Sequence, residues 1–176
     1  SDGTRLAFND TRKFGRFWLV ADPTEVLADL GMDALDADLT AEKFVAMLAG
    51  KQRQLKPLLM DQSFIAGLGN IYTDEALFLA GLHPLSLASA VPVEQAQRLL
   101  EAIHSVLEEG IRRNGASIDW VYRGGEFQNY FQVYQRQGQA CKRCQTAIER
   151  ILVGQRSTHF CPSCQPAPAK DPAGCN

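Results

Sequence analysis

Four cysteines near the carboxyl end of the chain have the spacing of a metal site. They form two Cys-x-x-Cys pairs separated by sixteen residues, Cys141 with Cys144 and Cys161 with Cys164. A two-residue gap lets both thiolates of a pair point at one ion, and the spacer is long enough for a β-hairpin to return the second pair to it. Four thiolates suit Zn²⁺ and leave no open position for a water nucleophile. The spacing therefore predicts one structural zinc ion, with two disulfides as the alternative interpretation.

A second group of residues that could bind a ligand is a glycine-rich turn, Gly67-Leu68-Gly69-Asn70, directly before a predicted helix. The free N–H groups at the start of a helix, together with the positive end of its dipole, attract anions. The two glycines let the backbone approach a phosphate closely, and Asn70 adds an amide donor. By itself the pattern is weak, because such a turn is more often only a tight corner between two helices.

Charge is divided unevenly along the chain, although the net charge is only −2. Residues 1–111 carry 9 basic and 16 acidic side chains, whereas residues 112–164 carry 8 basic and 3 acidic ones. Much of the acidity lies at 22–42, where seven carboxylates occur without a basic residue. The basic final third favours a polyanionic partner, and an ordinary solvated basic surface is the alternative.

The hydrophobic periodicity predicts a mainly α fold with a small β part. Helices are expected near 24–30 and at 41–49, 53–60, 71–80 and 93–113, and strands at 4–10, 14–20 and 127–135. Two strands alone cannot bury a core, so the first two are expected to be left over from a larger sheet. The sequence contains no run of about eighteen apolar residues, which excludes a transmembrane helix.

Several blocks of the sequence, in one order, resemble the formamidopyrimidine-DNA glycosylase and endonuclease VIII family. They are KxRxLKPLLMDQ from Lys51, GLGNIYxDEALFxAGxHP from Gly67, VYxRxG from Val133 and QRSTxFC from Gln155. Upstream, DTRKFG from Asp10 resembles a loop late in the family's N-terminal β-sandwich and favours the formamidopyrimidine branch. The resemblance covers about residues 5–165.

The resemblance implies a domain organisation. A helix–two-turns–helix DNA-binding domain is expected at 40–126, followed by a zinc-finger β-hairpin at 127–165. Residues 1–21 would be a remnant of the catalytic β-sandwich, residues 22–39 an acidic linker and residues 166–176 a disordered tail, in which Cys175 is expected to be a free thiol.

The resemblance also implies contacts to the DNA backbone. Asn70 and Arg156 would hold the phosphates that flank a damaged nucleotide, with Gly69 in the turn beside Asn70 and Lys51 as a further basic contact. Arg156 is also the residue that the family uses as proton donor in δ-elimination. Because a guanidinium normally stays protonated, this role is less secure than phosphate binding. For Lys51 the alternative is a solvated surface charge.

Two upstream residues would contact the opposite strand and the base stack. In the family's pattern Arg12 pairs with the base that is left without a partner, and Phe14 inserts into the stack when the damaged base is extruded. A surface charge and an ordinary sheet residue are the respective alternatives. Farther on, the adjacent acids Asp74 and Glu75 are expected to complement the helix dipole in the first turn rather than to form a catalytic pair.

The family's chemistry uses an N-terminal proline amine as nucleophile, followed by a glutamate. The first residues of this chain, Ser1-Asp2-Gly3-Thr4, supply neither. The expectation is therefore the DNA-binding and zinc-finger portion of a glycosylase/AP lyase that removes oxidised purines in base-excision repair, inactive by itself. Its partner would be double-stranded DNA with a damaged base or abasic site, and it would be a bacterial, cytoplasmic, nucleoid-associated monomer that does not bind membranes.

Two other kinds of function stay open from the sequence. The first is a stand-alone nucleic-acid-binding zinc-ribbon module without catalysis, which would bind intact and damaged duplex equally. The second is a protein-interaction module in which the zinc hairpin only holds a helical bundle together. The charge division and the Asn70 and Arg156 motifs argue more strongly against the second.

Overall fold

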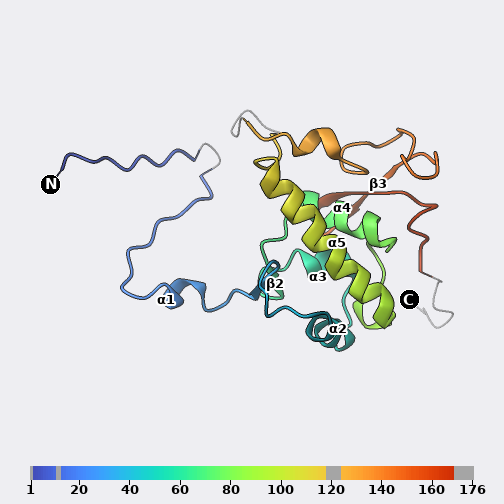
Figure 1. Ribbon diagram of the computed structural model, residues 1–176, viewed down its shortest axis with the longest axis horizontal. Coiled ribbons are helices and arrows are strands. Elements are labelled where there is room, and N and C mark those ends of the chain that lie inside the picture. Colours follow the sequence, from blue (N-terminus) through green and yellow to red (C-terminus); the bar gives the residue numbers. More distant parts are fainter. Residues whose placement is uncertain (1, 11–12, 118–123, 169–176) are drawn as a thin grey trace.

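The computed structural model describes residues 2–10, 13–117 and 124–168 of the 176-residue chain. Its longest helix is α5 (Val93–Arg112), against which α2 (Ala41–Ala49) and α4 (Asn70–Ala80) pack (Figure 1). The buried residues of α5 recur at helical spacing, as the sequence predicts: Ala96, Leu99, Leu100, Ile103, Val106 and Leu107. This apolar face is the centre of the main hydrophobic core.

The helix ends follow from local sequence chemistry. The Thr40 hydroxyl accepts a hydrogen bond from the backbone N–H of Lys43 at 3.3 Å, which caps α2. Helix α4 begins directly after Gly69 and stops at Gly81, whose φ of 69° is left-handed. Helix α3 (Leu55–Leu59) is shorter than predicted and holds Pro57 in its first turn, where a missing N–H does no harm. Two 3₁₀ turns, η1 (Ala88–Ala90) and η2 (Phe127–Tyr130), complete the helical part.

In the part of the chain that the structure describes, the strands form two small pairs. Strand β3 (Glu149–Val153) pairs antiparallel with β4 (Arg156–Phe160), and the two residues between them both have positive φ, as in a type I′ turn. This is the hairpin predicted between the cysteine pairs. Strand β1 (Met32–Asp33) runs parallel to β2 (Ile65–Ala66).

The acidic stretch at 22–39 is only partly a linker. It contains the short helix α1 (Thr24–Leu27), close to the predicted position. However, its second half joins the core through β1 and through Ala34 and Leu39, which are buried. The acidic side chains of this half stay on the surface while Ala34 and Leu39 between and after them pack inward, so the high density of charge concealed their contribution to the core.

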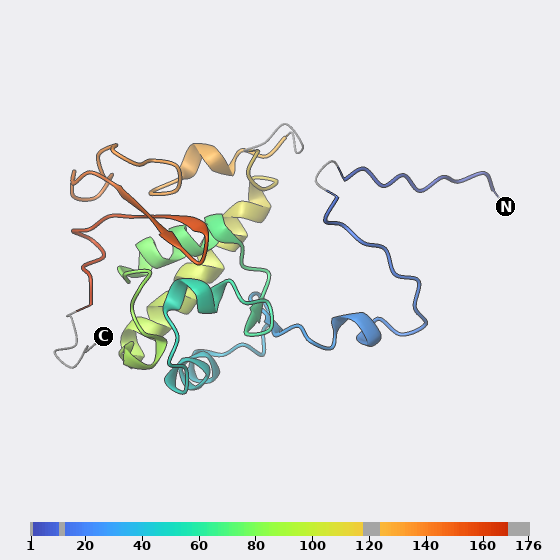
Figure 2. The ribbon, with the colours of Figure 1, turned by 180° about the vertical axis from the view of Figure 1, so that it is seen from behind.

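The strands predicted at 4–10 and 14–20 are not formed in the described residues of these segments. The chain there runs away from the helical body, as Figures 1 and 2 both show, and its apolar side chains lie open, with Leu6 85% and Leu19 102% exposed. Within the described residues no strand lies beside them to accept their backbone hydrogen bonds, and a strand requires such a neighbour.

The strand predicted at 127–135 is also wrong. This segment begins with η2 and continues as irregular chain. The backbone N–H groups of residues 132–134 do not pair with a strand because they donate to a side-chain carboxylate, described below. None of the helices in the described part of the chain combines the length and apolarity needed to cross a membrane.

Candidate nucleic-acid interface and zinc site

The four predicted zinc ligands converge. The sulfur atoms of Cys141, Cys144, Cys161 and Cys164 all lie within 4.8 Å of one another, with separations of 3.4 Å for 144–161 and 3.9 Å for 141–164. A tetrahedral ion with Zn–S bonds of about 2.3 Å requires sulfur–sulfur separations of about 3.8 Å. The cysteines are unpaired thiols rather than disulfides. They are therefore positioned to bind one zinc ion, as the sequence predicts.

The thiols also have the electrostatics of a metal site. Hydrogen bonds from Thr146 lower the pKa of Cys144 to about 6, so this sulfur ionises first. Burial, reinforced by the neighbouring sulfurs, raises the pKa of Cys164 to about 12 and that of Cys161 in the same direction. Four sulfurs this close cannot all become thiolates unless a cation offsets their repulsion. Zinc supplies that charge.

The zinc module packs on α4. A second hydrophobic cluster joins Phe78 of α4 to Val133, Cys141, Ile148 and Cys161. On the Phe78 ring lies the guanidinium of Arg143, 4.4 Å from the ring centroid, a cation–π contact that closes the cluster from outside. The position of the hairpin is thus set by α4.

Asn70 contacts the zinc hairpin at strand β4. The side-chain N–H₂ of Asn70, the first residue of α4, donates to the backbone carbonyl of Ser157 at 3.0 Å and lies 3.4 Å from the Tyr134 hydroxyl. Ser157 directly follows Arg156 in β4. The helix start and the hairpin are therefore joined at Asn70 and at the residue next to the predicted Arg156. Tyr134, at the same junction, was not predicted as a site residue, although it lies inside the VYxRxG block.

Arg156 offers a free positive charge at this junction. Its side chain is exposed and makes no ion pair or hydrogen bond with the described residues. Its charge also contributes to lowering the pKa of the buried Lys56, where burial is the main cause. An unpaired guanidinium beside a helix N-terminus is suited to bind a phosphate.

The turn before α4 leaves space for a ligand. Gly67 has φ of 94°, a left-handed conformation that favours glycine. Gly69 has extended backbone, and a Cβ added there would meet no atom within 4 Å, so its surroundings are open. The side chain of Gln62 holds the turn, since it accepts from the Gly67 N–H at 3.0 Å and donates to the Leu68 carbonyl at 2.9 Å. Sequence reasoning did not identify this role of Gln62.

The expectation that Asp74 and Glu75 complement the dipole in the first turn of α4 is wrong. The helix begins at Asn70, so both acids lie in its second turn, and both are buried. Asp74 forms a buried ion pair with Lys56, and its other oxygen accepts from the His159 N–H at 2.9 Å. Lys56 also donates to the Asn70 carbonyl at 3.1 Å. Together these contacts connect α3, the start of α4 and β4.

Glu75 holds the chain that leads into the zinc module. Its carboxylate accepts hydrogen bonds from three successive backbone N–H groups, those of Gln132 at 2.8 Å, Val133 at 3.0 Å and Tyr134 at 2.8 Å. Burial raises the pKa of Glu75, and the three N–H donors oppose that rise. The partners lie at least 57 residues away in sequence, so helical periodicity could not reveal them.

Replacing Glu75 by glutamine is expected to lower the free energy of unfolding by about 1–3 kcal/mol, because a buried N–H loses its acceptor and meets an amide N–H₂ instead. Urea denaturation measures the change. Glu101→Gln, exposed on α5, is the matched control and should alter stability by less than about 0.5 kcal/mol. Equal stabilities of the two variants would contradict the role assigned to Glu75.

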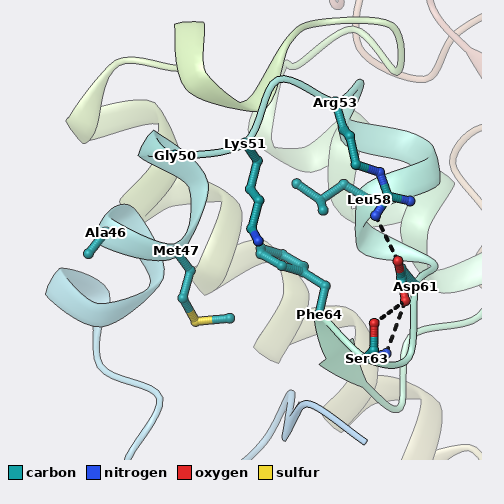
Figure 3. A pocket seen from close by; sticks show the side chains of 9 residues that line it. All are labelled: Ala46, Met47, Gly50, Lys51, Arg53, Leu58, Asp61, Ser63 and Phe64. Atoms are coloured by element: carbon teal, nitrogen blue, oxygen red, sulfur yellow. Dashed lines mark hydrogen bonds and ion pairs between the residues drawn. The ribbon is translucent and has the colours of Figure 1, made fainter. Parts of the chain in front are cut away.

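Lys51 lines a pocket whose lining does not include Asn70 or Arg156. No hydrogen bond or ion pair joins it to Asn70 or Arg156 in the described part of the chain; its ammonium group lies 5.9 Å from the ring centroid of Phe64. Figure 3 shows these two residues at a pocket of about 510 Å³, together with the ion pair between Arg53 and Asp61 at 2.7 Å. Hydrogen bonds from Ser63 and Arg53 lower the pKa of Asp61 to about 2. Lys51 is thus one of two cations at this pocket.

The structure does not test the two predictions for the upstream residues Arg12 and Phe14. Arg12 lies outside the described residues. Phe14 is 82% exposed in the extended N-terminal segment. Their roles at the opposite strand stay predictions.

Two regions of the chain match known families. Residues 30–121 match the formamidopyrimidine-DNA glycosylase H2TH domain, and residues 138–167 match the zinc finger found in FPG and IleRS. The formamidopyrimidine-DNA glycosylase of Chloroflexus aggregans is 48% identical over 171 residues, and that of Protochlamydia amoebophila is 44% identical over 172. Each alignment covers 93% of this chain and 62% of the relative, so the chain spans less than two thirds of their length.

Solved structures of the same family are similar to this fold. The MutM (FPG) protein from Thermus thermophilus has a TM-score of 0.82 and 40% identity, over 89% of this chain and 62% of that protein. The Lactococcus lactis Fpg in complex with DNA containing an abasic site has a TM-score of 0.77 and 35% identity, over 82% of this chain and 55% of that one. These matches confirm the predicted helix–two-turns–helix domain, zinc finger and formamidopyrimidine branch. Because one family match alone spans more than half of its residues, the chain belongs to the formamidopyrimidine-DNA glycosylase family.

Proposed function

We propose that these 176 residues form the DNA-holding part of a formamidopyrimidine-DNA glycosylase, with the sugar–phosphate backbone bound at the junction of α4 and the zinc hairpin. The observation that supports the proposal is the 3.0 Å hydrogen bond from Asn70 to the Ser157 carbonyl, which joins the start of α4 to the residue that follows Arg156 in β4. We infer that the Arg156 cation and the N-terminus of α4, both suited to bind phosphate, act on the same ligand.

The proposed partner is double-stranded DNA that contains a damaged base or an abasic site. Relatives of this chain have been solved with such ligands, including the Lactococcus lactis Fpg with an abasic site and with Fapy-dG in DNA. In our proposal Asn70, Gly69 and Arg156 hold the phosphates on either side of the lesion, and Tyr134 supports Asn70 from the hairpin side. Lys51 and Arg53 would contact the backbone farther along the duplex, at the pocket of Figure 3.

The proposed reaction of the whole enzyme is removal of an oxidised purine followed by strand cleavage. Residues 1–176 begin with Ser-Asp-Gly-Thr and contain no counterpart of the terminal proline and glutamate used for the nucleophilic step. We therefore expect this segment, produced alone, to bind DNA without excising a base. Arg156 would serve the later δ-elimination by orienting the phosphate leaving group.

Binding to an abasic duplex, measured against salt concentration, tests the proposal. Each phosphate contact adds about 0.9 to the slope of log affinity against log salt. Arg156→Gln should lower that slope by about 0.9 and weaken binding about 10- to 100-fold, because a hydrogen bond to a charged group contributes about 1.5–3 kcal/mol. Arg98→Gln, exposed on α5, is the matched control and should change neither quantity.

The two rival functions give different results in the same titration. A nucleic-acid-binding module without a glycosylase's preference would bind intact and abasic duplex with equal affinity. A protein-interaction module would bind neither duplex at any salt concentration, and Arg156→Gln would have no effect. Either outcome would overturn the proposed function.

A further inference from the structure

We propose that Arg150 of β3 is an additional phosphate-binding residue of the zinc hairpin, and that Ser157 holds its guanidinium in position for this contact. This inference rests on the proposed function, because it extends the same DNA interface by one residue.

The first observation is the geometry of the pair. Nη2 and Nε of Arg150 donate to the Ser157 hydroxyl at 2.7 and 3.1 Å, so two donors of one fork converge on a single oxygen. In the strand register Arg150 lies opposite His159, two residues from Ser157 on β4. Residues two apart on a strand share a face, so this diagonal contact belongs to the face of the hairpin that carries Ser157.

The second observation connects this pair to the proposed phosphate site. Ser157 uses its hydroxyl for Arg150 and its carbonyl for the Asn70 amide, which lies 3.0 Å away. Arg150, Ser157 and Asn70 therefore form a continuous series of hydrogen bonds across the junction of hairpin and helix. In our proposal a DNA backbone that is bound at Asn70 continues past Ser157 to Arg150.

The third observation is that Arg150 has N–H donors that make no hydrogen bond within the described residues. Its side chain is exposed and has no carboxylate partner in the described ranges, and the neutral hydroxyl of Ser157 satisfies only one edge of a guanidinium with five N–H donors. Arg136 in the same module shows the contrasting arrangement. Its three nitrogens donate to the carbonyls of Gln132 and Ala140 and to the side chain of Gln139, which accounts for a purely structural role.

The contact to Ser157 has a physical benefit for binding. A free arginine side chain must lose rotamer freedom when it binds a phosphate, and that loss offsets part of the interaction. The Ser157 hydroxyl removes much of this freedom beforehand and leaves the remaining N–H groups for a phosphate, which accepts two of them in parallel.

The experiment uses the zinc-loaded chain and a duplex with an abasic-site analogue. Arg150→Gln should weaken binding about tenfold at low salt and lower the salt slope by about 0.9, as expected for one lost phosphate contact. Arg150→Lys keeps the charge and should preserve the slope, and Arg98→Gln removes an equal charge from α5. Ser157→Ala should weaken binding severalfold with an unchanged slope, because the charge remains but is no longer held.

The outcomes separate this inference from the proposed function. If Arg156→Gln lowers the slope and Arg150→Gln behaves like Arg98→Gln, the role of Arg150 is refuted while the interface stands. If the wild-type chain shows no salt-dependent binding, the proposed function itself fails, and the Arg150 inference fails with it. Zinc content and thermal melting of each variant show whether it is folded. If Arg150→Gln is not folded, Arg150→Lys provides the test, and a salt slope for that variant lowered by about 0.9 overturns the proposal.

Discussion

Removal of the zinc ion is expected to unfold the module at 138–165 and to abolish DNA binding, while the helical core persists. Apart from the metal, the module is held by a two-stranded hairpin, by the hydrogen bonds of β4 to Asn70 and Asp74, and by a small hydrophobic cluster. Two of the five buried residues of that cluster are the zinc ligands Cys141 and Cys161. A two-stranded hairpin is marginal in water by itself. Structural zinc contributes about 10–16 kcal/mol in small zinc-finger peptides, far more than this cluster can supply.

The measurement is a chelator titration followed by circular dichroism and amide NMR spectra. Helical signal from α2, α4 and α5 should remain, whereas the amide signals of β3 and β4 should lose their dispersion. Cys161→Ser should reproduce the effect, and Cys175→Ser, outside the described residues, is the matched control. A hairpin that keeps dispersed signals after the metal is gone would contradict the prediction.

Lowering the pH is expected to release the zinc ion, as a chelator does. Zinc binds thiolates, so metal affinity falls as protons compete for the sulfurs. The sulfur with the lowered pKa, Cys144 at about 6, is the last to be protonated as pH falls, and the buried Cys164, with pKa about 12, depends most on the metal for its charge.

The sequence was sufficient for those parts of the site that depend on local spacing. The zinc ligands lie within two short Cys-x-x-Cys segments, and the turn of Gly67 and Gly69 precedes its helix directly, so residue types at fixed offsets determine both. The long helix α5 was predictable for the same reason, since its apolar residues repeat every three or four positions. Its predicted and observed ends differ by a single residue at the carboxyl side.

Contacts between distant segments could not be read in this way. From the sequence, Asp74 and Glu75 were predicted to lie at the surface of a first helical turn. No neighbouring residue in the sequence indicates that the backbone N–H groups of residues 132–134 and 159 bind them. The segment at 127–135 alternates like a strand, yet its N–H groups bind the Glu75 carboxylate. The alternating residues at 4–20 have strand character that only a neighbouring sheet could realise.

One face of α4 carries most of what the proposed function requires. Asn70, Asp74 and Phe78 recur every four residues, so they lie above one another along the helix. Asn70 contacts the hairpin at Ser157, and Asp74 accepts a hydrogen bond from the backbone N–H of His159. Phe78 packs against two of the zinc ligands. The predicted zinc ion would thus fix the hairpin at one end of this face, and the proposed phosphate site lies at the other.

Of these three residues of α4, Asp74 is expected to have the largest effect on the free energy of unfolding when it is replaced. Asp74→Ala should lower the free energy of unfolding by about 3–5 kcal/mol, because it leaves the buried Lys56 ammonium without its counter-charge. Asp29→Ala, exposed, is the matched control. The double variant Lys56→Met/Asp74→Ala should recover part of the loss in urea denaturation. If the double variant is as unstable as the sum of the single ones, the two side chains are not coupled.

The pH dependence of the same variant gives a second, independent test. Burial lowers the pKa of Lys56 and Asp74 opposes that effect, so removing Asp74 lowers the Lys56 pKa further. A lysine whose pKa is lower in the folded state than in the unfolded state favours folding more as pH rises between the two values. The stability difference between wild type and Asp74→Ala should therefore shrink as the pH is raised toward about 10.4, the pKa of lysine in the unfolded chain, because the variant's Lys56 loses its proton at lower pH than the wild type's. A difference that stays constant over this range would mean that the lost hydrogen bond to His159, rather than the unpaired charge, accounts for the destabilisation.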